Sequence, residues 1–159
     1  MTGKSDFTED EWVRIVRAPF VAGMAISLAD PGGPIEAAKE SMASIRSATN
    51  PPTREQLLAE VALDIQAQAQ AHQNPLHGYK PTTAGAAPGE QVVAELREVS
   101  AMVASKATAD EASAFAAWLV ETAQDAANAA KEGGFMGFHA ERVSARETDM
   151  IERVRDAVS

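Results

Sequence analysis

The chain has 159 residues, no cysteine and a formal net charge of −9. This length fits one domain with a single core. The missing cysteines exclude disulfides and thiolate chemistry. The acidic balance disfavours nucleic acid and anionic membrane surfaces as partners. No signal-peptide pattern follows Met1, and the longest uncharged apolar run, residues 18–29, is shorter than the ~20 residues of a membrane span. We therefore expect a single cytoplasmic domain over residues 1–159.

The composition predicts helices. The chain contains 33 alanines, the residue with the highest helix propensity, and its β-branched and aromatic residues never alternate over the length of a strand. The larger apolar residues recur at helical spacing. We expect an all-α fold, a compact bundle of about six helices.

Four capping boxes mark where helices should begin. In a capping box, a Ser or Thr and a Glu or Gln three residues later satisfy each other's free backbone N–H groups. The four pairs are Thr8 with Glu11, Thr53 with Gln56, Thr108 with Glu111, and Ser144 with Glu147. Four matches, each followed by helical periodicity, indicate four helix starts.

The first half of the chain predicts three helices. The first covers about residues 9–28, with a kink or break near Arg17 because Pro19 removes a backbone donor, and its apolar second half should be the central buried helix. The second begins at Pro34 and ends before the Asn50-Pro51-Pro52 turn. The third begins at Thr53 and stops at Asn74-Pro75. The apolar stripe expected to be buried in the second helix is Ile35, Ala38, Met42 and Ile45.

A loop over residues 74–89, rich in Pro and Gly, separates these helices from three more. We predict these at about residues 90–106, 108–131 and 144–158, with a Gly-rich loop before the last. Thr8-Glu9-Asp10-Glu11 and Thr108-Ala109-Asp110-Glu111 each open a long helix followed by two glycines and a shorter helix. The chain can therefore be two pseudo-repeated helical hairpins with two helices between them, or generic helix signals can have produced the similarity by chance.

One candidate metal site lies around the Gly-rich loop after residue 131. Its carboxylates are Asp125, Glu132, Glu141 and Glu147, and calcium and magnesium prefer such oxygen ligands. The spacing of a calcium-binding EF-hand is absent, and no Lys-Ser/Thr follows the glycines as a phosphate-binding loop requires. The competing interpretation, which we favour, is a structural connection with capping or solvated carboxylates.

Two other patterns favour simple interpretations. Glu60, Asp64, Gln68 and His72 lie at four-residue steps on one helix face, which is typical of a solvated polar face. The loop histidines His77 and His139 are candidate acid–base groups, but neither has a nucleophile motif beside it.

Apolar residues in the loops form a candidate interaction surface. Tyr79, Phe135, Met136 and Phe138 have no helical periodicity to explain them. They fill gaps in an alanine-rich core or form a contact patch for a partner.

Two segments resemble the TerB-like group of all-helical bacterial domains, best known from tellurite resistance. The residues are Ala130-Lys131-Glu132-Gly133 with Val143-Ser144-Ala145-Arg146-Glu147, and, less closely, Ala29-Asp30-Pro31-Gly32-Gly33-Pro34-Ile35. Residues 134–142 interrupt the motif, and Glu132 replaces its Asp. The resemblance implies a metal-binding, stress-associated module without catalysis, with Asp30, Glu132 and Glu147 as the carboxylates of interest.

The sequence contains no catalytic triad and no nucleotide-binding loop. We therefore favour a non-enzymatic helical module that acts through protein association with a protein partner or as a homodimer, and that requires no cofactor. The alternative is a TerB-like domain that binds a divalent cation. A small hydrolase or lyase using His77 or His139 is a third hypothesis.

Overall fold

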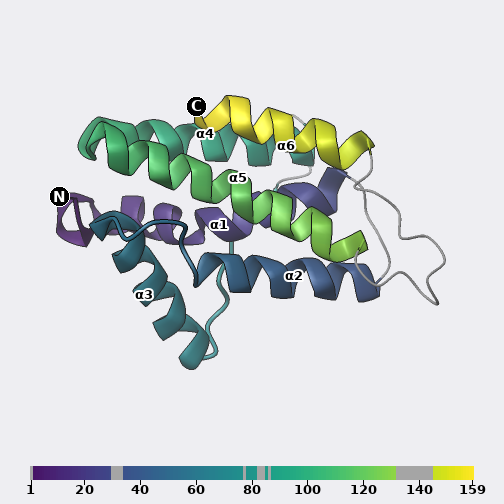
Figure 1. The fold of residues 1–159 in the computed structure, drawn as a ribbon, viewed down its shortest axis with the longest axis horizontal. Coiled ribbons are helices and arrows are strands. Elements are labelled where there is room, and N and C mark those ends of the chain that lie inside the picture. The colour runs from purple at the N-terminus through teal and green to yellow at the C-terminus, as the bar shows by residue number, and fades with distance from the viewer. Residues whose placement is uncertain (1, 30–33, 77, 82–84, 86, 132–144) are drawn as a thin grey trace.

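The structure, a computed structural model, describes residues 2–29, 34–76, 78–81, 85, 87–131 and 145–159. Over these residues the chain is all-helical and forms a compact bundle, as predicted (Figure 1). A short 3-10 helix, η1 (Lys4–Asp6), precedes six α-helices. They are α1 (Glu9–Ala29), α2 (Pro34–Ala48), α3 (Gln56–Gln70), α4 (Pro88–Lys106), α5 (Ala109–Lys131) and α6 (Ala145–Val158).

The first capping box is confirmed in full. The backbone N–H of Thr8 donates to Glu11 Oε1 at 2.9 Å, and the N–H of Glu11 donates to Thr8 Oγ1 at 3.2 Å. These two bonds satisfy donors that the start of α1 would otherwise leave unpaired. At α5 the N–H of Glu111 donates to Thr108 Oγ1 at 3.2 Å, while the Glu111 carboxylate accepts the backbone N–H of Thr2 at 3.0 and 3.2 Å. The Glu111 side chain of the Thr108–Glu111 pair therefore also ties the N-terminal segment to α5.

The predicted cap at Thr53 is wrong. Helix α3 begins three residues later, at Gln56, and its N-cap Glu55 makes no side-chain capping bond. The Gln56 side chain points along the helix and donates to Glu60 Oε2 at 3.2 Å, so it does not return to Thr53. The fourth box includes Ser144, which lies outside the described residues.

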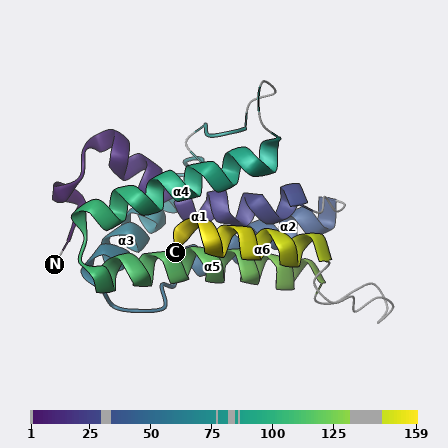
Figure 2. The ribbon, with the colours of Figure 1, turned by 90° about the horizontal axis from the view of Figure 1, so that it is seen from above.

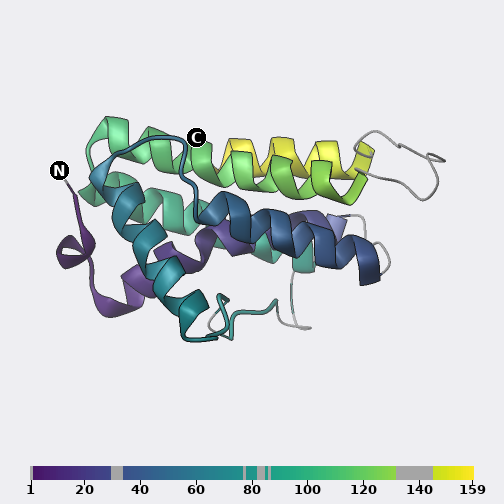
Figure 3. The ribbon, with the colours of Figure 1, turned by 60° about the horizontal axis from the view of Figure 1, so that its bottom comes forward.

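Helices α1 and α5 form the centre of the bundle, and each packs against all the other α-helices. Helix α2 packs mainly on α5, and α6 lies between α4 and α5 (Figure 2). Helix α3 runs steeply across the direction of the other helices (Figure 3). The described elements that it mainly packs against are α1, α5 and η1. The hairpins α1–α2 and α5–α6 are both present, whereas an origin by duplication stays a prediction.

The core contains large apolar residues of α1, α3, α4, α5 and α6. The fully buried ones include Ile15, Leu57, Leu58, Leu96, Phe115, Trp118, Leu119 and Val154. Helix α1 is continuous through Pro19, so no break occurs near Arg17, and the alternative of a kink stays a prediction. Pro19 is itself buried, and packing against the surrounding helices holds α1 in place around it.

Helix α1 is long and apolar enough to cross a membrane by length and composition alone. In the bundle 61% of its most apolar window is buried. The second half of α1 is buried as the sequence predicted, with Val21, Ala22, Ala25 and Ile26 all at 0% exposure. Its apolar character is thus accounted for by its central position.

Candidate functional site

Helix α2 buries a face of small residues against α5. Ala43, Ser44, Ser47 and Ala48 are all buried. Trp118 Nε1 donates to the backbone carbonyl of Ser47 at 2.8 Å, and Ser47 Oγ lies 3.0 Å from Thr122 Oγ1. Because the Thr122 hydroxyl donates to the carbonyl of Trp118, Ser47 is the donor in the Ser47–Thr122 pair. Small side chains and directional hydrogen bonds therefore hold α2 on α5.

The opposite face of α2 carries exposed apolar side chains. Met42 is 62% exposed and Ile45 is 44% exposed, so the prediction that they form the buried stripe of this helix is wrong. The side chains of Ile35 and Ala38 lie outside the described residues. Met42 and Ile45 are exposed because α5 and α1 approach α2 from its Ala/Ser face. We call Met42 and Ile45 the α2 apolar face.

An apolar groove borders this face. It has a volume of about 230 Å³ and lies between α1, α2 and the start of the loop after α3. Its apolar lining comes from Phe20, Met24, Ile45, Pro75 and Leu76, and Gly23 and three serines line the rest. The α2 apolar face is therefore continuous with a recess that extends towards the core.

A separate polar cleft of about 300 Å³ lies between α2 and α5 and contains Asp125. Glu121 lines the same cleft from one helical turn earlier, and burial, together with the negative charge of Asp125, raises the pKa of Glu121. Arg46 of α2 also lines the cleft and supplies a positive charge there.

The predicted metal ligands are only partly described. Asp125 lies in this polar cleft and Glu147 is buried in α6, while Glu132 and Glu141 lie outside the described residues. In the part of the chain that the structure describes, no three His, Asp or Glu residues are grouped closely enough to hold a metal ion. The metal site therefore stays a prediction.

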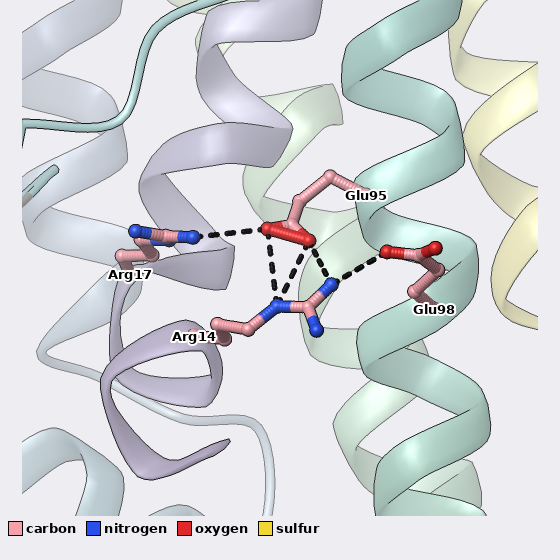
Figure 4. Close-up of polar contacts among 4 residues, drawn as sticks. All are labelled: Arg14, Arg17, Glu95 and Glu98. Carbon is pink, nitrogen blue, oxygen red and sulfur yellow. Dashed lines mark hydrogen bonds and ion pairs between the residues drawn. The ribbon is translucent and has the colours of Figure 1, made fainter. Parts of the chain in front are cut away.

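A charged network that was not predicted from the sequence joins α1 to α4 (Figure 4). Glu95 has a side chain only 10% exposed and accepts bonds from both Arg14 and Arg17. Arg17 Nη2 lies 3.1 Å from Glu95 Oε2, and Arg14 Nη2 also reaches Glu98 Oε2 at 2.7 Å. Hydrogen bonding to Glu95 raises the pKa of Arg14.

Tyr79 covers this network from the loop between α3 and α4. The Arg17 guanidinium lies 4.9 Å from the centre of the Tyr79 ring, a cation–π distance. Burial raises the pKa of Tyr79, and the negative charge of Glu95 adds to this effect. Leu76 and Tyr79 both pack on the core, and this packing explains why two large apolar side chains occur in this loop. The other predicted interaction residues, Phe135, Met136 and Phe138, lie outside the described residues.

The two arginines and two glutamates balance in charge, so the network is a clamp between helices and leaves no net charge for a ligand. Its signal in the sequence was the i, i+3 spacing of Arg14 with Arg17 and of Glu95 with Glu98. Sequence spacing shows which residues share a helix face, but it does not show which faces meet.

The polar row on α3 is not a solvated face along its whole length. Asp64 Oδ2 accepts a 2.6 Å hydrogen bond from Trp12 Nε1, and Gln68 lies half-buried one turn later. His72 leaves the row because α3 ends at Gln70 and His72 has a positive φ of 55°. His72 is exposed, and His77 and His139 lie outside the described residues.

Comparison with known proteins finds no matching family model, no matching curated protein and no matching solved structure. The resemblance to TerB-like domains therefore stays a prediction.

Proposed function

We propose that this protein is a non-catalytic association module that forms a homodimer through the α2 apolar face. The observation that carries the proposal is the orientation of α2. This helix buries Ala and Ser against α5 and leaves Met42 and Ile45 exposed beside an apolar groove. Exposed apolar side chains that adjoin one another mark contact surfaces more often than isolated ones do.

A second copy is the occupant that this face suits best. In a two-fold symmetric dimer the same patch lies on both sides of the interface, so one apolar face can cover another without any further element. The charges along the sequence of α2 are also self-complementary. Its first half carries one net negative charge, from Glu36, Lys39 and Glu40, and Arg46 follows Ile45. An antiparallel pairing of two α2 helices brings the acidic half of each towards the basic end of the other.

The net charge of −9 on each copy opposes this association. Salt screens charge repulsion between surfaces and leaves apolar contacts largely intact. We therefore expect the dimer to strengthen as salt is raised from about 50 to about 500 mM. A dimer held mainly by exposed ion pairs would weaken over the same range.

Sedimentation equilibrium over a concentration series tests the proposal. We expect the unmodified chain to dimerise with a Kd of about 100 μM or tighter. The double variant Met42→Glu/Ile45→Glu should sediment as a monomer, because it places four carboxylates at the centre of the interface. Both residues are exposed, so the variant should keep the helical circular dichroism of the parent.

Leu63→Glu is the matched control. Leu63 is 62% exposed like Met42, but it lies on α3, away from the α2 apolar face. This variant should dimerise as the parent does. A parent chain that stays monomeric at about 1 mM, or a Leu63→Glu variant that loses dimerisation as fully as the double variant, would contradict the proposal.

A further inference from the structure

A second recess lies at the other end of the molecule, where η1, the start of α1 and α3 meet. It has a volume of about 430 Å³, within the size range of small-molecule sites. Its apolar lining comes from Phe7, Trp12, Val13 and Val16, and Asp64 and Gln68 line it from α3. It does not overlap the α2 apolar face and is independent of the proposed dimer.

The recess has an aromatic wall and a fixed carboxylate. The rings of Phe7 and Trp12 pack with their centres 5.9 Å apart. Trp12 Nε1 donates to Asp64 Oδ2 at 2.6 Å, which fixes the orientation of this carboxylate. The Phe7 ring already attracts a cation, because Lys106 Nζ lies 5.4 Å from its centre.

Two hydrogen-bond acceptors of the residues that line this recess have no donor among the described residues. Gln68 Oε1 is buried and accepts no hydrogen bond. Both contacts of the Asp64 carboxylate, from Trp12 and Lys4, reach Oδ2, which leaves Oδ1 open. A buried acceptor without a partner, such as Gln68 Oε1, costs free energy and needs an explanation, whereas the Asp64 carboxylate is 32% exposed. A ligand that brings N–H donors would satisfy both groups.

The charges of the lining also select the ligand. Asp64 and Glu9 outnumber Lys4, so the lining carries one net negative charge. Lys4 Nζ lies 3.2 Å from Asp64 Oδ2, but its side chain is 60% exposed. An ion pair this exposed contributes little stability, so the Lys4 ammonium can be displaced.

We propose that this recess binds a primary ammonium group carried on an apolar stem. The ammonium would donate to Asp64 Oδ1 and Gln68 Oε1, and the stem would pack on Val13, Val16 and the aromatic wall. An ammonium has three N–H donors, which suits a site that offers acceptors. Lys4 is an internal competitor, because its own ammonium already binds the same carboxylate.

The indole N–H of Trp12 provides the readout. The chain has only two tryptophans, and Trp118 is fully buried in a hydrogen bond to Ser47, so two indole signals appear in an ¹⁵N-labelled sample. We expect phenethylamine to shift the Trp12 signal saturably, with a Kd of about 1 mM or tighter, and to leave the Trp118 signal in place. Phenethyl alcohol, which has the same stem without the charge, should not bind.

Variants separate the site from nonspecific binding. Lys4→Met removes the competitor and should tighten phenethylamine binding several-fold. Asp64→Asn should weaken it by about tenfold or more, as expected for loss of a charge-assisted bond. Asp149→Asn on α6 removes the same charge far from the recess and should bind as the parent does.

The source of the ammonium is tested with a second ligand, a short peptide in which a single lysine is the only amine. Binding of phenethylamine alone indicates a small-molecule amine, and binding of the peptide with comparable affinity indicates a lysine of a partner protein. The proposal is overturned if neither ligand shifts Trp12 in the parent and in Lys4→Met at about 10 mM, or if phenethyl alcohol binds as well as phenethylamine. Because the Lys4 side chain is 60% exposed, Lys4→Met should fold as the parent does, and it keeps the test valid even if Asp64→Asn does not fold.

Discussion

The polar side chains that hold the bundle together act in small groups that link separate helices. Glu95 is a clear case, because a carboxylate with a side chain only 10% exposed would be costly without partners. Arg14 and Arg17 supply those partners from α1. Trp118 similarly uses its indole N–H to hold the end of α2. Each group replaces hydrogen bonds to water with hydrogen bonds between helices.

Glu121 offers a test of electrostatics at the scale of one residue. Its pKa is raised by burial and by the charge of Asp125, so its ionised form is less favourable in the folded protein than in the unfolded chain. A carboxyl group with a raised pKa contributes stability at low pH and loses that contribution as the pH rises through the folded-state pKa. Glu121→Gln should therefore stabilise the protein at pH 7, and the gain should vanish towards about pH 4.

Urea unfolding of Glu121→Gln and the parent at several pH values measures this effect. Asp149→Asn changes the net charge by the same amount and serves as the control. If both variants gain the same free energy of unfolding at pH 7, the gain comes from the change in net charge. That result would contradict the local effect of the raised Glu121 pKa.

Among the elements, α2 shows how packing depends on side-chain size. Its small face lies close to α1 as well as to α5. A Cβ added to Gly23 of α1 would lie 2.1 Å from Ser44 Oγ of α2. The two helices approach this closely only because residue 23 has no side chain. The close approach fixes which face of α2 remains outside.

Gly23→Val tests this packing. The branched side chain should force α1 and α2 apart and destabilise the protein by about 1–3 kcal/mol, the usual range for overpacking. Gly23→Ala should cost less, because the Ser44 hydroxyl can rotate and alanine favours the helix by about 1 kcal/mol over glycine. Chemical denaturation measures the free energy of unfolding of both variants. A Gly23→Val variant as stable as the parent would show that a larger side chain fits between α1 and α2.

At the scale of the whole molecule, the bundle has a centre and a periphery. Helices α1 and α5 pack against all the other α-helices, while α3 packs at one end of the bundle and crosses it steeply (Figure 3). The buried residues of α3, Leu57, Leu58, Val61, Ala62 and Ile65, lie on one side, and Leu63 is exposed. The proposed ammonium site depends on α3 through Asp64 and Gln68.

This arrangement predicts a hierarchy of local stability. Backbone amides of α3 should exchange with solvent faster than those of the second half of α1, because fewer contacts must break to expose them. Hydrogen–deuterium exchange followed by mass spectrometry measures the difference. Saturating phenethylamine should slow exchange in α3, because the proposed site includes Asp64 and Gln68 of that helix. Equal protection of α3 and α1 without ligand would indicate that the bundle opens only as one unit.

The sequence by itself determined the local features. The Thr8–Glu11 capping box, the positions of most helices and the buried second half of α1 were predictable, because capping and periodicity depend on neighbours within a few residues. The predicted start of α3 was wrong, because α3 begins at Gln56 without a local capping signal.

Only the tertiary structure decided which helix faces meet. The apolar stripe of α2 predicted a buried face, yet Met42 and Ile45 are exposed, because the hydrogen bond from Trp118 and the close approach at Gly23 favour the Ser/Ala side. The pairing of Trp12 with Asp64 spans 52 residues and had no signal in the sequence. Periodicity fixes the faces that a helix has, but the fit between side chains of distant helices selects the face that is buried and the residues that remain for binding.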